Sequence, residues 1–208
     1  MRIYKITSIV IALVGLLVMF GWFVGNDTLT RIVPGFVTMK ITTAFCFFLS
    51  GILLFLRTNK RNSVKQYGIF VSCYTIFIIM SFLLIEALFN IDLGFHNLLV
   101  IEQAAVLSLG PGIPSIATMF LFFLVATMGL LFIENGIGRM IRLFLGGIIG
   151  FVSGVGLLGY FFNIQTMYYY VEGKSTAMAI HTCLLFFIIG LSTILYEHYQ
   201  KAVTKLHK

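Results

Sequence analysis

The sequence predicts an all-α integral membrane protein with six transmembrane helices, arranged as three parallel helical-hairpin repeats around a pseudo-threefold axis. Three observations lead to this prediction. The chain of 208 residues is 60% hydrophobic and only 10% charged, whereas a soluble domain carries about 25% charged residues. Its mean hydropathy is +1.04. It also contains six long apolar runs, and short phrases within them recur in the same order.

The six apolar runs are the candidate spans, and each must be helical because lipid cannot pair an open backbone. They cover residues 6–25, 37–56, 67–89, 115–133, 141–162 and 178–196. No small-residue cleavage site follows Gly21-Trp22, so we expect an uncleaved first helix. We expect one membrane domain over residues 1–208, with hairpins over about 5–57, 66–134 and 140–197 and a basic cytoplasmic tail over 198–208.

The charges predict the orientation of this bundle. If both termini lie on one side, only Arg31, Lys40 and Lys174 of the 14 lysines and arginines fall on the other side. Cytoplasmic loops carry the excess of lysine and arginine. We therefore expect a multi-pass protein of the cell (plasma or inner) membrane with both termini cytoplasmic. The net charge of +7 then requires no nucleic acid. The expected partners are the lipid bilayer and either a second copy or a separate signalling or complex partner.

The second helix of each expected hairpin begins with the same four-residue spacing. The matched positions hold Met39-Thr43-Phe47-Gly51, Pro114-Thr118-Phe122-Ala126 and Met178-Thr182-Phe186-Gly190. A spacing of four places these residues along one helix face. Three units in the same orientation imply an axis along the membrane normal. Threonine and glycine at this spacing either let helices pack closely or contribute to a site, and packing is the commoner use.

Ionisable groups at membrane depth are costly and are therefore candidates for function. Lys40, Glu86 and His181 each fall about one turn from the expected outer boundary. Lys40 and Glu86 are either interfacial anchors, an ion pair, or part of a shared polar site. We expect the matched outer positions to surround a ligand site, unless their side chains simply fill the bundle core. The candidate ligand-binding residues are Trp22, Met39, Lys40, Thr43, Glu86, Thr118, His181 and Thr182.

Metal binding and catalysis receive little support. His96 and His181 are weak candidates for holding a metal or haem, with Asp92 and Glu102 as further chemically adequate ligands. No helix carries a compact histidine pair, so we assign no metal, and the cofactor is unknown. The chain contains no nucleophile elbow, phosphate-binding loop, H-E-x-x-H or C-x-x-C motif. We therefore expect no enzyme.

The repeated phrases resemble the multi-pass N-terminal membrane sensor region found ahead of PAS, histidine-kinase and diguanylate-cyclase modules in many prokaryotic proteins. The resemblance implies an input domain, generally without an assigned ligand. The chain departs from that pattern at Gly112-Ile113-Pro114, and it holds no output module, which implies an isolated sensor half or a stand-alone relative acting through a partner. The residues that carry the resemblance are Gly21-Trp22, Pro34 to Lys40 with Thr43-Ala44, Phe47 and Gly51, and Met178 to Thr182 with Phe186 and Gly190.

The sequence thus predicts a membrane-embedded sensory or ligand-binding module. A small or lipid-like ligand would bind in the outer half, and the signal would leave through residues 178–196 or a partner protein. A small transporter or channel is the alternative, and it requires a polar path through several helices. Residues 6–25, 37–56 and 141–162 offer almost no such path. An accessory subunit of a larger membrane complex is the third interpretation.

Overall fold

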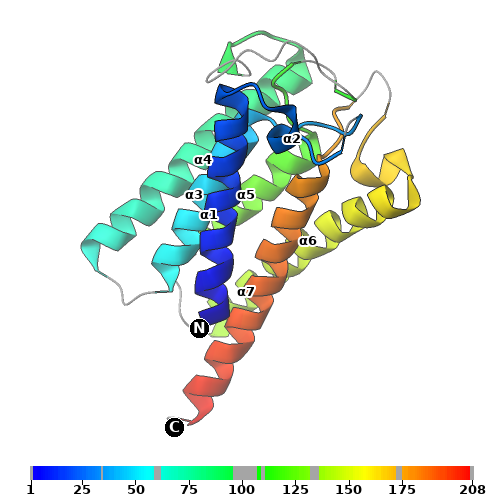
Figure 1. Ribbon diagram of the computed structural model, residues 1–208. Coiled ribbons are helices and arrows are strands. Elements are labelled where there is room, and N and C mark those ends of the chain that lie inside the picture. Colours follow the sequence, from blue (N-terminus) through cyan, green and yellow to red (C-terminus); the bar gives the residue numbers. More distant parts are fainter. Residues whose placement is uncertain are drawn as a thin grey trace.

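The computed structural model describes residues 2–33, 35–58, 62–95, 107–108, 111–131, 136–171 and 175–206. Within these ranges the long elements are all α-helices (Figure 1). A short helix, α2 (Asp27–Thr30), and a 3₁₀ helix, η2 (Gln165–Tyr168), lie in two of the connections. The long helices are α1 (Arg2–Phe23), α3 (Ile41–Arg57), α4 (Ser63–Phe89), α5 (Ile116–Leu130), α6 (Gly136–Phe162) and α7 (Ile180–Leu206).

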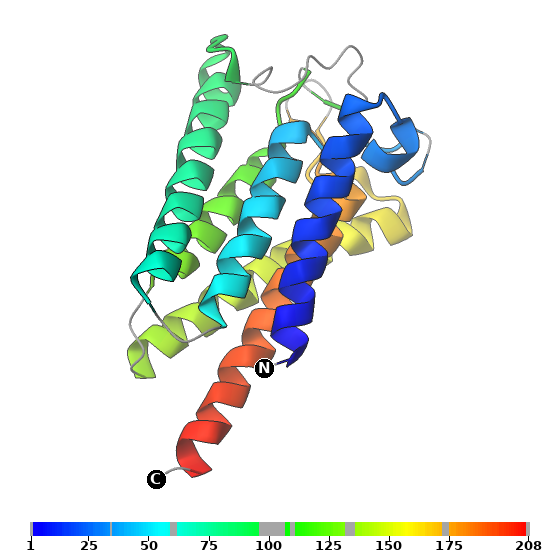
Figure 2. The ribbon, with the colours of Figure 1, turned by 60° about the vertical axis from the view of Figure 1, so that its left-hand side comes forward.

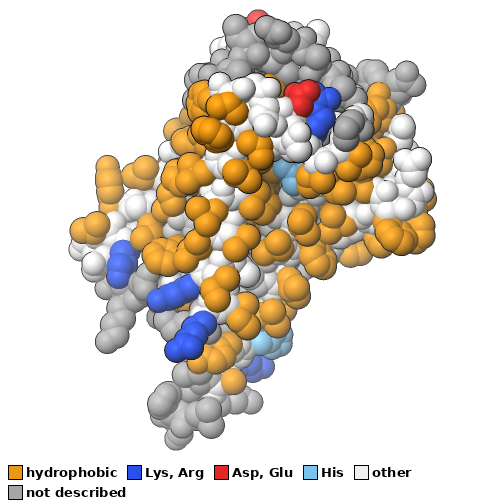
Figure 3. Space-filling model, viewed as in Figure 1, with side chains coloured by type: hydrophobic (Ala, Val, Ile, Leu, Met, Phe, Trp, Pro, Cys, Tyr) orange, Lys and Arg blue, Asp and Glu red, His pale blue; other side chains and the backbone are white. Residues whose placement is uncertain are grey.

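Four of these helices are long and apolar enough to cross a bilayer: α1, α4, α6 and the Ile180–Ala202 part of α7. The surface of the bundle is rich in exposed hydrophobic side chains (Figure 3). In water such a surface would aggregate, whereas in lipid it needs no cover. The helices α3 and α5 are apolar but shorter, with 17 and 15 residues. At 1.5 Å per residue they span about 25 Å or less, against a hydrocarbon core of about 30 Å.

The short length of α3 corrects the expected helix start at residue 37. Residues 37–40 are extended, and α3 begins only at Ile41. The amide of Met39 donates to the carbonyl of Thr30, 2.9 Å away in the preceding connection. The same happens before α7, where the amide of Met178 donates to the carbonyl of Tyr168 at 2.9 Å. These two segments, which lead into α3 and α7, are extended because their backbone amides donate to the preceding connection and not to a helical turn.

Both ends of the chain lie at the same end of the bundle (Figures 1 and 2). We name this the inner end and the opposite one the outer end, following the expected orientation. Helix α7 projects beyond the other helices at the inner end (Figure 2). It runs to Leu206, so most of the segment expected as a tail continues the helix.

The long helices pack in a regular cyclic order. We call α1, α4 and α6, which run from the inner to the outer end, the outgoing helices, and α3, α5 and α7, which run back, the returning helices. Each outgoing helix contacts the returning helix of its own pair and that of a neighbouring pair: α1 contacts α3 and α7, α4 contacts α5 and α3, and α6 contacts α7 and α5. The returning helices α3, α5 and α7 therefore lie at the centre. There Phe47, Phe122 and Phe186 are fully buried and contact one another, with ring centroids 4.7 to 4.8 Å apart. We call these three residues the phenyl triangle.

Glycine allows the outgoing and returning helices to touch. A Cβ added to Gly51 of α3 would lie 2.6 Å from the carbonyl oxygen of Ser8 on α1. A Cβ added to Gly190 of α7 would lie 2.5 Å from the backbone nitrogen of Gly150 on α6. Gly51 and Gly190 occupy matched positions of the sequence repeat. Backbone contact at these points is the use of small residues that membrane helices favour.

The outgoing helices also end alike. Gly25, Asn90 and Asn163 follow α1, α4 and α6, and all three have positive φ, at 67°, 54° and 56°. Glycine and asparagine tolerate this left-handed conformation better than other residues. Asn90 and Asn163 therefore mark chain reversals, and their counterpart in the first pair is Gly25.

Candidate functional site

Three of the expected site residues meet around the backbone of Thr30. The indole nitrogen of Trp22 donates to the carbonyl oxygen of Met39 at 2.8 Å. The amide of Met39 donates in turn to the Thr30 carbonyl. The His181 ring, on another helix, also faces the Thr30 backbone. Trp22 therefore braces the extended segment before α3, whose backbone groups require partners at this depth.

The third helix pair repeats this brace with a different side chain. The hydroxyl of Tyr160 donates to the carbonyl oxygen of Met178 at 2.8 Å. Tyr160 stands one residue after Gly159, as Trp22 does after Gly21. Tyr160 was not among the predicted site residues, although the glycine-aromatic pair Gly159-Tyr160, which matches Gly21-Trp22, contained the signal. Trp22 and Tyr160 each donate a hydrogen bond to the backbone of the extended segment before a returning helix.

Glu86 holds the second outer connection. Its Oε1 accepts hydrogen bonds from the amides of Leu93 and Phe95, each at 2.9 Å. A buried carboxylate is stabilised by such charge-assisted bonds. Glu86 stands four residues before the chain reversal at Asn90, as Gly21 and Gly159 stand four residues before Gly25 and Asn163. Its burial thus has a structural cause within its own connection.

Lys40 lies at the N-terminal boundary of α3. It is buried, and its backbone has φ −64° and ψ 146°. Ser115, at the matched position before α5, has φ −66° and ψ 148°. The Ser115 hydroxyl accepts from the amide of Thr118 and lies 2.7 Å from its hydroxyl. Lys40 makes no such cap, so the matching positions share a backbone geometry but differ in the group that they place there.

The matched threonines lie one turn outward of the phenyl triangle. Thr43, Thr118 and Thr182 are all buried, and each precedes a residue of the triangle by four positions on the same helix. Since residues four apart share a helix face, each threonine lies on the same helix face as its own phenylalanine of the triangle. Their convergence on a common site stays a prediction.

Several buried polar atoms at the outer end lack partners. In the described part of the chain, the hydroxyls of Thr42 and Thr43 have no hydrogen bond, and neither ring nitrogen of His181 reaches hydrogen-bond geometry, although the ring faces the Thr30 backbone. An unpaired buried polar group costs about 1–3 kcal/mol, so it requires an explanation such as a bound molecule. We call these three residues the outer polar cluster. Thr42 was missed by the sequence analysis because it lies beside the repeated position.

The expected metal ligands do not assemble among the described residues. Two of the four, His96 and Glu102, lie outside the described residues. Asp92 accepts a hydrogen bond from the amide of Gly94 at 2.8 Å. No group of three histidine, cysteine, aspartate or glutamate side chains comes together in the described ranges. His181 therefore enters the site as a buried polar side chain that faces the Thr30 backbone.

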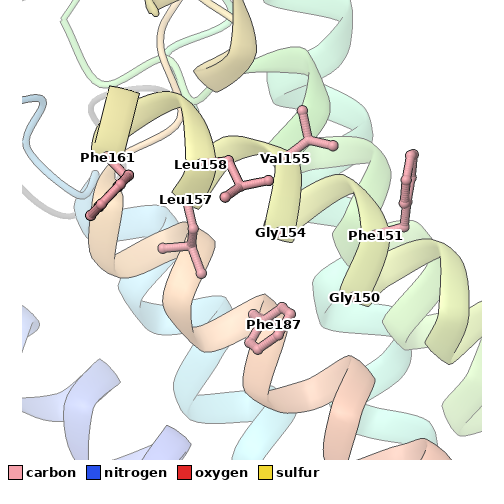
Figure 4. A pocket seen from close by; sticks show the side chains of 8 residues that line it. All are labelled: Gly150, Phe151, Gly154, Val155, Leu157, Leu158, Phe161 and Phe187. Carbon is pink, nitrogen blue, oxygen red and sulfur yellow. The ribbon is translucent and has the colours of Figure 1, made fainter. Parts of the chain in front are cut away.

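A second feature lies away from the axis. Figure 4 shows a groove between α6 and α7, with a volume of about 610 Å³. In this view Leu157 of α6 and Phe187 of α7 point into the gap between the two helices. The groove is lined by Gly150, Phe151, Gly154, Val155, Leu157, Leu158, Phe161 and Phe187. We call it the lateral groove.

The inner end carries a buried ion pair. Arg142 of α6 donates from Nε to Oε1 of Glu197 on α7 at 2.5 Å, and from Nη2 to Oε2 at 3.1 Å. Tyr196, the neighbour of Glu197, stacks on Tyr4 of α1 with ring centroids 4.3 Å apart. From the sequence, Arg142 was expected only as one of the basic residues that determine the orientation. The one acidic residue of α7 was the available signal for the pair.

Comparisons with protein-family models, with curated proteins and with solved structures find no match to this chain. The geometry described above is therefore the basis for assigning a function.

Proposed function

We propose that this chain is a membrane-embedded sensory module. It would be a six-span bundle of three parallel hairpins around a pseudo-threefold axis, with a ligand in its outer half. The observation that carries the proposal is the continuity of α7, which runs unbroken from Ile180 to Leu206. One helix thus bears His181 of the outer polar cluster and Glu197 of the inner ion pair. A change at one end can reach the other through a rigid element.

The threefold arrangement is supported by three independent features. The outgoing helices pack on the returning helices in cyclic order. The phenyl triangle unites the same repeat position from α3, α5 and α7. The residue before α3 and the residue before α5 agree in φ and ψ within a few degrees. On this basis α3 and α5 also cross the membrane, with their extended approaches completing the span.

The mechanism follows from the crossing of α6 and α7. From His181 to Glu197 the helix rises about 24 Å at 1.5 Å per residue. Its backbone touches α6 between these points, at Gly190. A ligand that binds one packing of α7 better than another shifts the balance between them, and only that difference in affinity produces a signal. The crossing converts an outer displacement into a change near the inner ion pair.

The axis itself favours a sensor over a transporter. Transport along it requires a polar path, but the phenyl triangle closes the centre with three contacting aromatic rings. Among the described residues, the unpaired polar atoms of Thr42, Thr43 and His181 lie on the outer side of this closure. That of Thr193 lies on the inner side, so the aromatic rings separate them. A signal that leaves through α7 requires a partner at the inner end. The basic residues gathered there support a cytoplasmic position for that end.

The test measures whether the outer polar cluster affects the inner end. Spin labels are placed at Val64→Cys, at the start of α4, and Tyr199→Cys, on α7. Both positions are exposed, whereas the native cysteines are buried. In nanodiscs, His181→Ala is expected to shift the distance distribution between the labels, measured by pulsed electron paramagnetic resonance. Leu184→Ala, exposed on the same helix, is the matched control. A His181→Ala distribution identical to that of the unsubstituted chain would overturn the proposal.

A further inference from the structure

The lateral groove lies in the outer half of the bundle. Its lining runs from Gly150 to Phe161 on α6, toward that helix's outer end, and includes Phe187, two turns into α7 from the outer side. Both helices are candidates to cross the bilayer. The groove therefore opens sideways at membrane depth, where its surroundings are hydrocarbon.

The lining is entirely apolar. It consists of two glycines, two leucines, one valine and three phenylalanines. A pocket for a polar small molecule contains a few polar groups that orient the ligand. This groove provides none, so hydrogen bonding selects nothing within it. Its volume of about 610 Å³ is within the usual range of ligand pockets, about 300–1,000 Å³. The occupant must be a hydrocarbon.

The shape of the groove favours a flexible acyl chain over a second helix as its occupant. Gly150 and Gly154 form its floor, and Phe151 and Phe161 stand near its two ends (Figure 4). These rings are 74% and 81% exposed. They are about 15 Å apart along the helix, from the rise of 1.5 Å per residue. A straight helix cannot approach the glycine floor past both rings, whereas an acyl chain can lie between them.

We propose that the lateral groove binds one acyl chain of an outer-leaflet membrane lipid. The chain lies over Gly150 and Gly154 and against the Phe187 ring. Gly150 also faces Gly190 at the crossing of α6 and α7. Occupancy of the groove therefore changes the packing of these two helices. This link to signalling rests on the proposed sensory function, whereas the binding itself does not.

The binding is tested in nanodiscs of phosphatidylcholine that contain a small share of phosphatidylglycerol with a diazirine in one acyl chain. After irradiation, adducts are mapped by mass spectrometry. We expect adducts to concentrate on residues 150–161 and 187, and a larger excess of unlabelled phosphatidylglycerol or phosphatidylcholine to reduce them equally, because the apolar lining does not distinguish headgroups. Gly154→Leu fills the floor and is expected to lose this competable labelling. Gly147→Leu is the matched control, because a side chain there meets open space.

A replacement variant guards against unfolding of Gly154→Leu, and three outcomes would contradict the proposal. If Gly154→Leu lowers the melting temperature, Leu158→Trp replaces it, because Leu158 lines the groove from an exposed position. Adducts spread evenly over the exposed faces of α1, α4 and α6 overturn the proposal. So does labelling by a diazirine palmitic acid but not by the phospholipid, or a cross-linked dimer joined through the groove. Competable labelling without a distance change in the His181→Ala experiment overturns the sensory function and leaves the groove assigned.

Discussion

Arg142 and Glu197 form a two-pronged ion pair between α6 and α7, although 55 positions separate them in the chain. Both residues are buried, and they lie on the inner side of the glycine crossing of the same two helices. The pair therefore ties together the helix ends that the proposed signal has to move.

The first prediction concerns this pair. Arg142→Ala leaves the Glu197 carboxylate buried and unpaired, which is expected to cost about 3–5 kcal/mol. Replacing both residues, as Arg142→Met with Glu197→Leu, is expected to cost less than Arg142→Ala alone, because no charge remains buried. Thermal unfolding in detergent measures both. A double variant that is less stable than the single one would contradict the assignment of a buried pair.

The second prediction concerns the helix crossing. Gly190→Ala places a Cβ within 2.5 Å of the Gly150 backbone nitrogen, and such overpacking costs about 1–3 kcal/mol. Gly150→Ala is expected to be tolerated, because its Cβ would lie 3.9 Å from Gly190. The melting temperatures of the two variants should therefore differ strongly. Equal melting temperatures would mean that the backbones do not touch at Gly190.

The third prediction concerns the aromatic brace. Tyr160→Phe removes only the hydroxyl that donates to the Met178 carbonyl. The lost hydrogen bond should lower the free energy of unfolding by about 1 kcal/mol. Tyr67→Phe is the control, since Tyr67 is 73% exposed. Circular dichroism during heating compares the two variants, and an equal effect of both would argue against a brace.

The fourth prediction concerns orientation. Because basic residues gather at the inner end, a cysteine at Val64 should be protected from membrane-impermeant maleimide in intact cells. A cysteine at Thr166, exposed at the outer end, should react. Permeabilised cells provide the control, in which both positions are labelled. The reverse pattern would place the outer polar cluster on the cytoplasmic side.

Much of the candidate site was accessible from periodicity alone. Thr43, Thr118 and Thr182 were selected because each stands four residues before a matched phenylalanine, and helical geometry places such residues on one face. Pairings across the chain were not accessible in this way. The contact of His181 with the Thr30 backbone joins segments 151 positions apart, and no local pattern contains it.

Helix boundaries likewise were predicted only in part from the sequence. Hydropathy located the run at residues 37–56, because composition reports the environment of a segment. It did not reveal that residues 37–40 are extended. An apolar extended segment and an apolar helix have the same hydropathy. The difference arises from partners elsewhere in the chain, namely the Trp22 indole and the Thr30 carbonyl.

The sequence by itself determined that this protein is helical, belongs in lipid and repeats its phrases at fixed positions. These properties follow from composition and from spacing along single helices, which require no knowledge of neighbours. Only the tertiary structure decided which backbones touch, where Arg142 finds its carboxylate and where the lateral groove opens. Those features depend on the crossing of helices distant in the chain, and small residues permit a close crossing without specifying the partner helix.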